Sequence, residues 1–138
     1  MSRRALHGAA AALGLLAYLS AAAAAEPLAL RIRNDTPAPL RCVLLLAHWY
    51  SEEVGPVAPG GSAGLALESG LPDGTVVRRN NLARAMAVEG LYCLTGEADG
   101  AERASVPLEA LRKATGTLLV TCRRTPRVGC AAATLAAP

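Results

Sequence analysis

The sequence contains no phenylalanine, and its 138 residues include only one tryptophan and three tyrosines. Aromatic side chains bury the largest apolar areas, so a core without them must be built from leucine, valine and alanine, which bury less area each. A small domain with so lean a core usually needs covalent cross-links to be stable. The four cysteines are therefore expected to provide them.

Charge of either sign is also scarce, since 14 basic and 11 acidic side chains give a formal net charge of +3. Two of the basic side chains, Arg3 and Arg4, lie in an N-terminal segment that we expect to be removed, which leaves 12 basic against 11 acidic side chains. Domains that bind nucleic acid carry a concentrated basic field. No nucleic-acid partner is therefore expected.

Residues 1–25 have the organisation of a cleaved signal peptide. Arg3 and Arg4 form a positive start, residues 9–19 are apolar, and Ala23 to Ala25 provide a cleavage site of small residues. The apolar run is short and rich in alanine, which argues against a membrane anchor. We expect a bacterial protein that is periplasmic or secreted, exported by the general or the twin-arginine route, with no membrane span after cleavage.

Four cysteines lie beyond the signal peptide: Cys42, Cys93, Cys122 and Cys130. An even number of cysteines in an oxidising compartment is typical of disulfides. Structural zinc sites favour cysteines two to four residues apart, and no two here are closer than eight positions, so no metal is expected. Of the three possible pairings we favour Cys42–Cys93, which would tie early strands to late ones, with Cys122–Cys130, which would close a proline-containing loop.

Short apolar segments between turns rich in Gly and Pro predict β-strands. Residues 28–34 alternate between apolar and polar side chains, which is typical of a half-buried strand. Arg41 to Tyr50 is the longest apolar segment outside the N-terminus, and we expect it to form one central strand buried on both faces. Between these strands, Asn34-Asp35-Thr36 favours a turn, although it also spells an N-glycosylation acceptor.

The rest of the chain predicts further short strands and a single helix. Residues 83–94 have some helix propensity, but alternation and Gly90 favour a strand with a bulge. Pro107 suits the first turn of a helix that has Ser105 near its N-cap and ends at Gly116. Other strands are expected at residues 63–68, 75–78 and 117–122, with a turn or an added hairpin at 123–130.

Six or so strands with turns every 8–12 residues predict an all-β fold, a small antiparallel β-sandwich with one short connecting helix. It would form a single domain over residues 26–130, with a flexible C-terminal tail over 131–138. Cys42 and Cys93 lie in apolar strands 51 positions apart, and this architecture resembles immunoglobulin-like domains. Trp49 follows Cys42 too closely for that family, and Tyr92 lies one residue nearer the second cysteine. The resemblance implies no function.

Aromatic and ionisable side chains gather at one place, between residues 48 and 53. Because Trp49 and Tyr50 alternate across the expected strand, at most one of them should be buried, unless both fill the core. An exposed aromatic side chain beside charges is a common anchor for a binding partner. The candidate binding residues are His48, Trp49, Tyr50, Glu52 and Glu53, and the partner is expected to be an envelope protein or a small ligand.

The alternative is an enzyme or a metal-handling protein. His48 is the single histidine beyond the signal peptide, and Glu52, Glu53 or Glu89 could act with it. No serine lies in a Gly-x-Ser-x-Gly elbow, and a recognisable metal site needs two or more histidines. Glu89 is expected to point to solvent or, if buried, to pair with Arg41, Arg78 or Arg84. We therefore expect a non-enzymatic binding or accessory protein without a cofactor.

Overall fold

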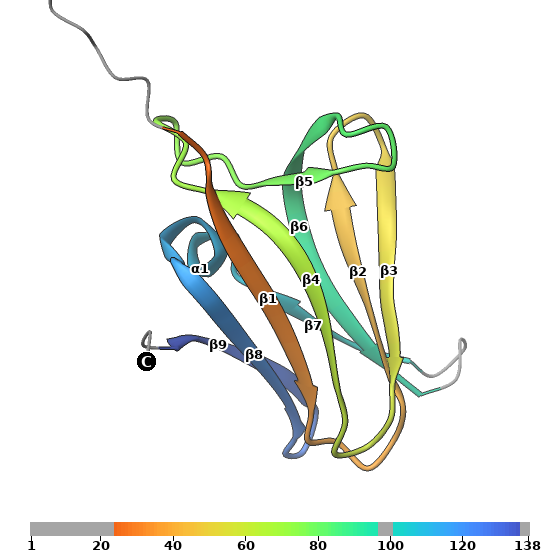
Figure 1. Ribbon diagram of the computed structural model, residues 1–138. Coiled ribbons are helices and arrows are strands. Elements are labelled where there is room, and N and C mark those ends of the chain that lie inside the picture. Colours follow the sequence, from red (N-terminus) through yellow and green to blue (C-terminus); the bar gives the residue numbers. More distant parts are fainter. Residues whose placement is uncertain (1–23, 97–100, 136–138) are drawn as a thin grey trace, which may run out of the picture.

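The computed structural model describes residues 24–96 and 101–135 (Figure 1). The predicted signal peptide, apart from Ala24 and Ala25, lies outside the described residues, as do residues 97–100 and 136–138. No helix in the described ranges is long and apolar enough to cross a membrane.

The described residues form a mostly β structure with one short helix, which confirms the expected class of secondary structure. The elements are β1 (Glu26–Asn34), β2 (Leu40–Leu46), β3 (Tyr50–Val57), β4 (Ser62–Ser69), β5 (Val77–Arg79), β6 (Ala85–Thr95), β7 (Glu102–Val106), α1 (Leu108–Lys113), β8 (Gly116–Arg124) and β9 (Val128–Leu135).

The strands form one mixed sheet that is not closed, in the order β3-β2-β6-β5-β4-β1-β8-β9, with β7 paired to β6. All pairings are antiparallel except that of β1 with β8, which is parallel (Figure 1). The expectation of a purely antiparallel arrangement is therefore wrong at this pairing. A parallel neighbour needs a long crossover connection, and α1 lies immediately before β8 at the end of that crossover.

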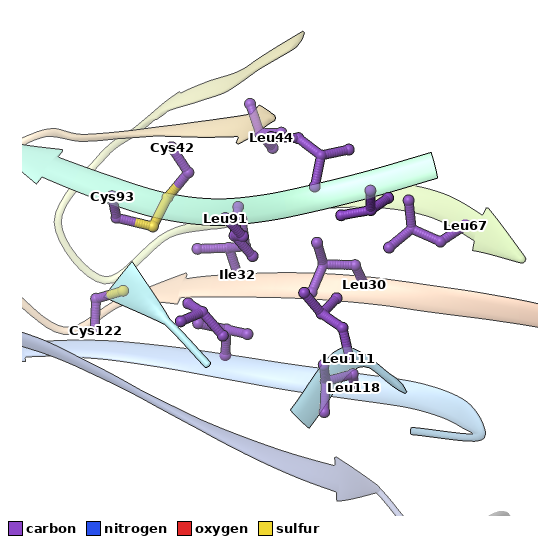
Figure 2. Close-up of a cluster of buried hydrophobic side chains, with 14 of the residues drawn as sticks. Leu30, Ile32, Cys42, Leu44, Leu67, Leu91, Cys93, Leu111, Leu118 and Cys122 are labelled. Carbon is purple, nitrogen blue, oxygen red and sulfur yellow. A yellow bond between two sulfur atoms is a disulfide. The ribbon is translucent and has the colours of Figure 1, made fainter. Parts of the chain in front are cut away.

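The sheet curves around a single apolar core (Figure 2). Side chains of β1 and β8 meet those of β2 and β6, although β1 and β2 are not neighbours in the sheet. Leu111 of α1 is fully buried beside them and lies next to Leu118. The predicted alternation of the first strand is confirmed, because Leu28, Leu30 and Ile32 all point into this core.

The segment Arg41 to Tyr50, predicted as one strand, is instead a strand and a sharp turn. β2 ends at Leu46, and β3 begins at Tyr50 and returns antiparallel to β2. His48 and Trp49 make the reversal possible because both adopt left-handed backbone angles, with φ of 64° and 67°. These angles are uncommon for residues other than glycine. The segment contains none of the residue types that usually mark a turn, so its sequence does not predict one.

The ambiguous segment 83–94 is a strand, as predicted. In the pairing of β2 with β6, Leu45 faces Gly90 and Leu46 faces Val88, so the intervening Glu89 is the extra residue of a β-bulge. A side chain at Gly90 would come within 3.3 Å of the Leu45 side chain. The bulge predicted at Gly90 is thus confirmed to within one residue.

Two expectations for the C-terminal third need correction. The first is the start of the helix, because Ser105 belongs to β7, a strand that the sequence did not predict, and Pro107 is the N-cap of α1.

The residues after Cys122 form an added hairpin of β8 and β9, as one of the two predicted alternatives expected, and the second correction concerns the end of this hairpin. Residues 131–135, expected to be a flexible tail, continue β9 and pair along β8.

The predicted disulfides, Cys42–Cys93 and Cys122–Cys130, are both present. Each joins directly opposed residues on neighbouring strands: β2 with β6, and β8 with β9. The first bridge therefore lies within one sheet, unlike the inter-sheet bridge of immunoglobulin-like domains. Its effect is to fasten two adjacent strands whose cysteines are 51 residues apart in sequence.

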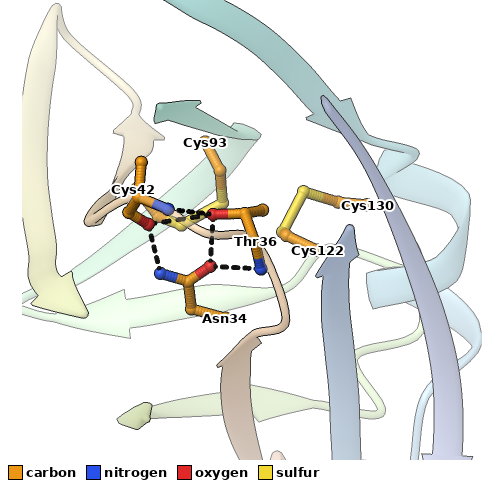
Figure 3. Close-up of a disulfide and its surroundings, with 7 residues drawn as sticks. Asn34, Thr36, Cys42, Cys93, Cys122 and Cys130 are labelled. Atoms are coloured by element: carbon orange, nitrogen blue, oxygen red, sulfur yellow. Dashed lines mark hydrogen bonds between the residues drawn. A yellow bond between two sulfur atoms is a disulfide. The ribbon is translucent and has the colours of Figure 1, made fainter. Parts of the chain in front are cut away.

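Asn34 fixes the corner between β1 and β2 (Figure 3). Its side chain is fully buried and donates to the carbonyl oxygens of Ala38 and Val57, each at 2.8 Å. Its carbonyl oxygen accepts from the backbone N–H of Thr36 at 2.9 Å and from the Thr36 hydroxyl at 2.7 Å. This supports the turn interpretation of residues 34–36, because a buried and fully bonded amide is not available for glycosylation.

Candidate functional site

The most exposed aromatic side chains lie at the tip of the β2–β3 hairpin. Trp49 is fully exposed, at 102% of its reference area, and Tyr50 is 63% exposed. Trp49 lies in the turn between β2 and β3, in a left-handed backbone conformation. The interpretation in which both aromatics fill the core is therefore wrong, and the exposure needed for binding is present.

An open groove lies beside this tip, between the end of the β2–β3 hairpin and the connection from β5 to β6. Its volume is about 1000 Å³. The lining comes from two parts of the chain that are remote in sequence but adjacent in the fold: Leu46, His48, Tyr50, Ser51 and Glu52 from the first, and Arg78, Arg79, Asn80, Asn81, Leu82, Arg84, Ala85 and Met86 from the second.

An ion pair in the lining holds the two sides together. The Arg78 guanidinium donates to both carboxylate oxygens of Glu52, from Nε and Nη2, each at 2.8 Å. Its Nη1 donates to the carbonyl oxygen of Ala66 on β4 at 3.1 Å. The hydrogen bonds from Arg78 lower the pKa of Glu52 below its ordinary value, against the opposing effect of partial burial. β3, an edge strand, is thereby connected to β5 and β4 through one side chain.

The connection between β5 and β6 is shaped by Asn80. Its side-chain oxygen accepts hydrogen bonds from the backbone N–H groups of Leu82 and Arg84, at 3.0 and 2.9 Å. This arrangement leaves Leu82 69% exposed on the rim of the groove. Arg84 is also exposed and makes no salt bridge with any of the residues that the structure describes.

The groove has a positive character. Its lining holds three arginines against one glutamate. Arg78 is neutralised by Glu52, and Arg79 by Glu68, whose Oε2 accepts from Nη2 at 3.0 Å. Arg84 is therefore the guanidinium most available to an incoming anionic group.

The structure brings together three of the five residues predicted as candidates. His48, Tyr50 and Glu52 line the groove, and Trp49 projects from the adjacent tip. Glu53 is exposed on β3 outside the lining.

Glu89 does not join these residues. It is exposed at the bulge of β6, as the solvent-facing interpretation expected. Arg78, one of the arginines considered as its partner, pairs with Glu52.

Sequence reasoning missed the second wall of the groove. Nothing in the sequence shows that the turn at Asn80 and Asn81 faces the β2–β3 hairpin. Only the pairing of β6 with β2, together with the Arg78–Glu52 ion pair, brings the two segments together.

Potential metal ligands gather at a different place. Within residues 24–96 and 101–135, the one group of three or more such side chains with their ligand atoms close together is Cys93, Cys122 and Cys130, whose sulfurs are engaged in disulfides. His48 forms no such group with Glu52 and Glu53 in that part of the chain. The metal interpretation of these residues thus lacks geometric support.

A comparison with protein-family models finds no match to this chain, and a search of curated proteins finds none either.

Proposed function

We propose that this is a small bacterial protein of the periplasm or the extracellular space that acts as a non-enzymatic binding or accessory module. The observation that carries the proposal is Trp49, fully exposed and in a left-handed conformation beside an open groove. Unusual backbone angles of this kind persist where surrounding structure enforces them, and they concentrate at ligand-binding sites. Aromatic side chains and arginine are the residue types that contribute most to binding energy at interfaces.

The partner that fits the site is an extended, acidic segment of an envelope protein. β3 is an edge strand, with β2 as its one neighbour in the sheet order, so an extended chain can add to it by backbone hydrogen bonds. Trp49 and Tyr50 would hold apolar side chains of that segment. Arg84, which has no acidic partner among the described residues, would attract its carboxylates.

The scaffold supports this use of the site. Two disulfides are typical of proteins that fold in an oxidising compartment. We propose that the curved sheet serves as a rigid, sandwich-like body, with the β2–β3 and β5–β6 connections as recognition loops at one end.

Trp49 provides the test, because it is the single tryptophan of the chain and its fluorescence reports its own environment. The probe is a synthetic ten-residue peptide in which glutamate alternates with valine and tyrosine, and its matched control has lysine at each glutamate position. We expect the acidic peptide alone to cause a saturable change in Trp49 emission. Equal responses to the two peptides, or none to either, would refute the proposal.

Variants measured by calorimetry locate the contact. Arg84→Glu and Trp49→Ala should each weaken binding of the acidic peptide by about tenfold or more, a change of about 1.4 kcal/mol. Arg31→Glu is the matched control, because Arg31 is exposed on β1 away from the groove. A loss of affinity in the control as large as in Arg84→Glu would mean that only the net charge matters.

An enzyme that uses His48 with Glu52 is the second candidate, because both residues line the groove. His48→Ala distinguishes the two. A binding module anchored by Trp49 should keep its affinity for the acidic peptide within about twofold, whereas an enzyme would lose its histidine and hence its activity.

A further inference from the structure

The two disulfides lie side by side at one end of the core (Figure 3). The sulfur atoms of Cys93, Cys122 and Cys130 all lie within 4.8 Å of one another. Cys122 and Cys130 form one bridge, whereas Cys93 belongs to the other. Glu102 holds the β8–β9 hairpin, which carries Cys130, against β7, the neighbour of the strand β6 that carries Cys93. This residue of β7 accepts from Arg124 at 3.1 Å and from the backbone N–H of Val128 at 2.9 Å.

The four cysteines differ in burial. Cys42, Cys93 and Cys122 are fully buried, whereas Cys130 is only partly buried. Cys130 lines a surface depression of about 390 Å³, together with the arginines Arg123 and Arg127. Arg123 pairs with Asp35 at 3.3 Å, whereas Arg127 makes no salt bridge with the residues that the structure describes. The attacking species in thiol–disulfide exchange is the thiolate anion, and the charge of Arg127 raises its local concentration at the depression. Cys130 is therefore the cysteine of the cluster that offers an external thiol the nearest approach.

We propose that the paired disulfides form a thiol-exchange relay, entered at Cys130, that carries an exchange reaction to the buried bridge. In the first step an external thiolate bonds to the sulfur of Cys130, and the Cys122–Cys130 bond breaks. Cys122 leaves as a thiolate, and Cys130 carries a mixed disulfide with the external thiol. No electrons are gained or lost overall, because one disulfide replaces another.

In the second step the released Cys122 thiolate attacks Cys93, whose sulfur lies within 4.8 Å. A Cys93–Cys122 bond forms, the Cys42–Cys93 bond breaks, and Cys42 takes the proton that the incoming thiol had lost. A second external thiol can then release Cys130 and leave as the external disulfide, so that two thiols are oxidised and one protein disulfide is reduced. The new bridge joins β6 to β8, which are not neighbours in the sheet.

The test is a time course of the full oxidised chain with glutathione, an anionic thiol, under native conditions. Samples are quenched with iodoacetamide and the bridges are mapped by mass spectrometry. We expect a glutathione adduct on Cys130 first, followed by alkylation of Cys42 together with a Cys93–Cys122 bridge. Alkylation of Cys42 and Cys93 together, without that bridge, would overturn the relay, as would a time course without any adduct on Cys130.

A variant tests the internal step without any external thiol. Cys130→Ser leaves Cys122 as a free thiol next to the buried bridge, so a population with a Cys93–Cys122 bridge and alkylated Cys42 should be present after purification. Alkylation of Cys122 alone would contradict the proposal. If this variant does not fold, as judged by circular dichroism, the time course of the unaltered chain decides.

A second variant tests the entry point. Arg127→Glu should slow adduct formation with glutathione by about threefold or more relative to neutral 2-mercaptoethanol, because it reverses one charge at the depression. Arg31→Glu, on the outer face of β1, is the matched control. An unchanged ratio of the two rates in Arg127→Glu would show that the depression does not guide the thiol.

Discussion

Replacing Asn34 by alanine tests whether the corner between β1 and β2 is a main support of this domain. The side chain is fully buried and takes part in four hydrogen bonds, two as donor and two as acceptor. Its removal leaves the carbonyl oxygen of Val57 and the N–H of Thr36 without this partner in a site that water does not reach. The carbonyl oxygen of Ala38 keeps one bond, from the Thr36 hydroxyl at 2.9 Å.

The expected cost follows from these lost partners. A buried polar group left without a partner costs about 1–3 kcal/mol, so two such groups make Asn34→Ala destabilising by about 2–6 kcal/mol. A domain of this size is stable by about 5–15 kcal/mol in total. The single substitution should therefore remove a large part of the stability while both disulfides remain intact.

Urea denaturation followed by circular dichroism, without reductant, measures the free energy of unfolding. The matched control is Asn80→Ala, since the Asn80 side-chain oxygen also accepts two hydrogen bonds, here both from backbone N–H groups, but in an exposed loop where water can replace it. The control should lose less than about 1 kcal/mol. If Asn34→Ala loses no more stability than Asn80→Ala, the buried hydrogen bonds of Asn34 do not stabilise the corner between β1 and β2.

Three further predictions concern other parts of the fold. Arg78→Ala should lower stability by about 0.5–1 kcal/mol at neutral pH, since the paired side chains of Arg78 and Glu52 are 24% and 34% exposed. Arg78 lowers the pKa of Glu52 below its ordinary value of 4.5, so the stability difference between the unaltered chain and Arg78→Ala should be fully present above pH 4.5. It should disappear as the pH falls through the pKa of Glu52 in the folded state. Denaturation curves measured from pH 7 to 3 check this. Reduction should lower the free energy of unfolding by about 4 kcal/mol for Cys42–Cys93, whose cysteines are 51 residues apart, and by about 2.5 kcal/mol for Cys122–Cys130, whose cysteines are 8 residues apart. An unchanged melting temperature in reductant would contradict this. Ser69→Ala should leave stability unchanged or raise it by about 1 kcal/mol in thermal melts, because the buried hydroxyl has no hydrogen-bond partner among the described residues.

Much of the secondary structure could be predicted because local patterns carry it. The alternation of Leu28, Leu30 and Ile32 identifies β1, and Gly90 distinguishes the bulged strand β6 from a helix. The disulfide pairing followed from one further consideration, namely which strands and loops each bridge would join. These signals depend on side chains near in sequence, or on covalent chemistry that permits few alternatives.

The features that were missed lack a clear signal in the sequence around them. The turn at His48 and Trp49 has neither glycine nor proline, and its left-handed angles are enforced by the pairing of β2 with β3. β7 is short, and the alternation of Ala104 and Val106 with polar residues is too weak to identify it. The parallel pairing of β1 with β8 cannot be predicted, because alternation indicates a strand but not the direction of its neighbour.

The candidate site shows the same division. Its first wall, from His48 to Glu52, was recognised from the crowding of aromatic and ionisable side chains. The second wall, with Leu82 and Arg84, follows an unremarkable turn and becomes part of the site only through the tertiary fold. A sequence can thus indicate candidate residues for a site, but the shape of the groove depends on the order of the strands.

The parallel pairing of β1 with β8 also determines when this domain can be completed. β1 is the first strand of the described chain and β8 is the last but one, so a polypeptide emerging from its N-terminus presents β1 long before its neighbour is available. During that interval one side of β1 is an open backbone edge of the kind that recruits other unfolded chains. A newly made molecule therefore keeps this edge of β1 unpaired until its last two strands have been added.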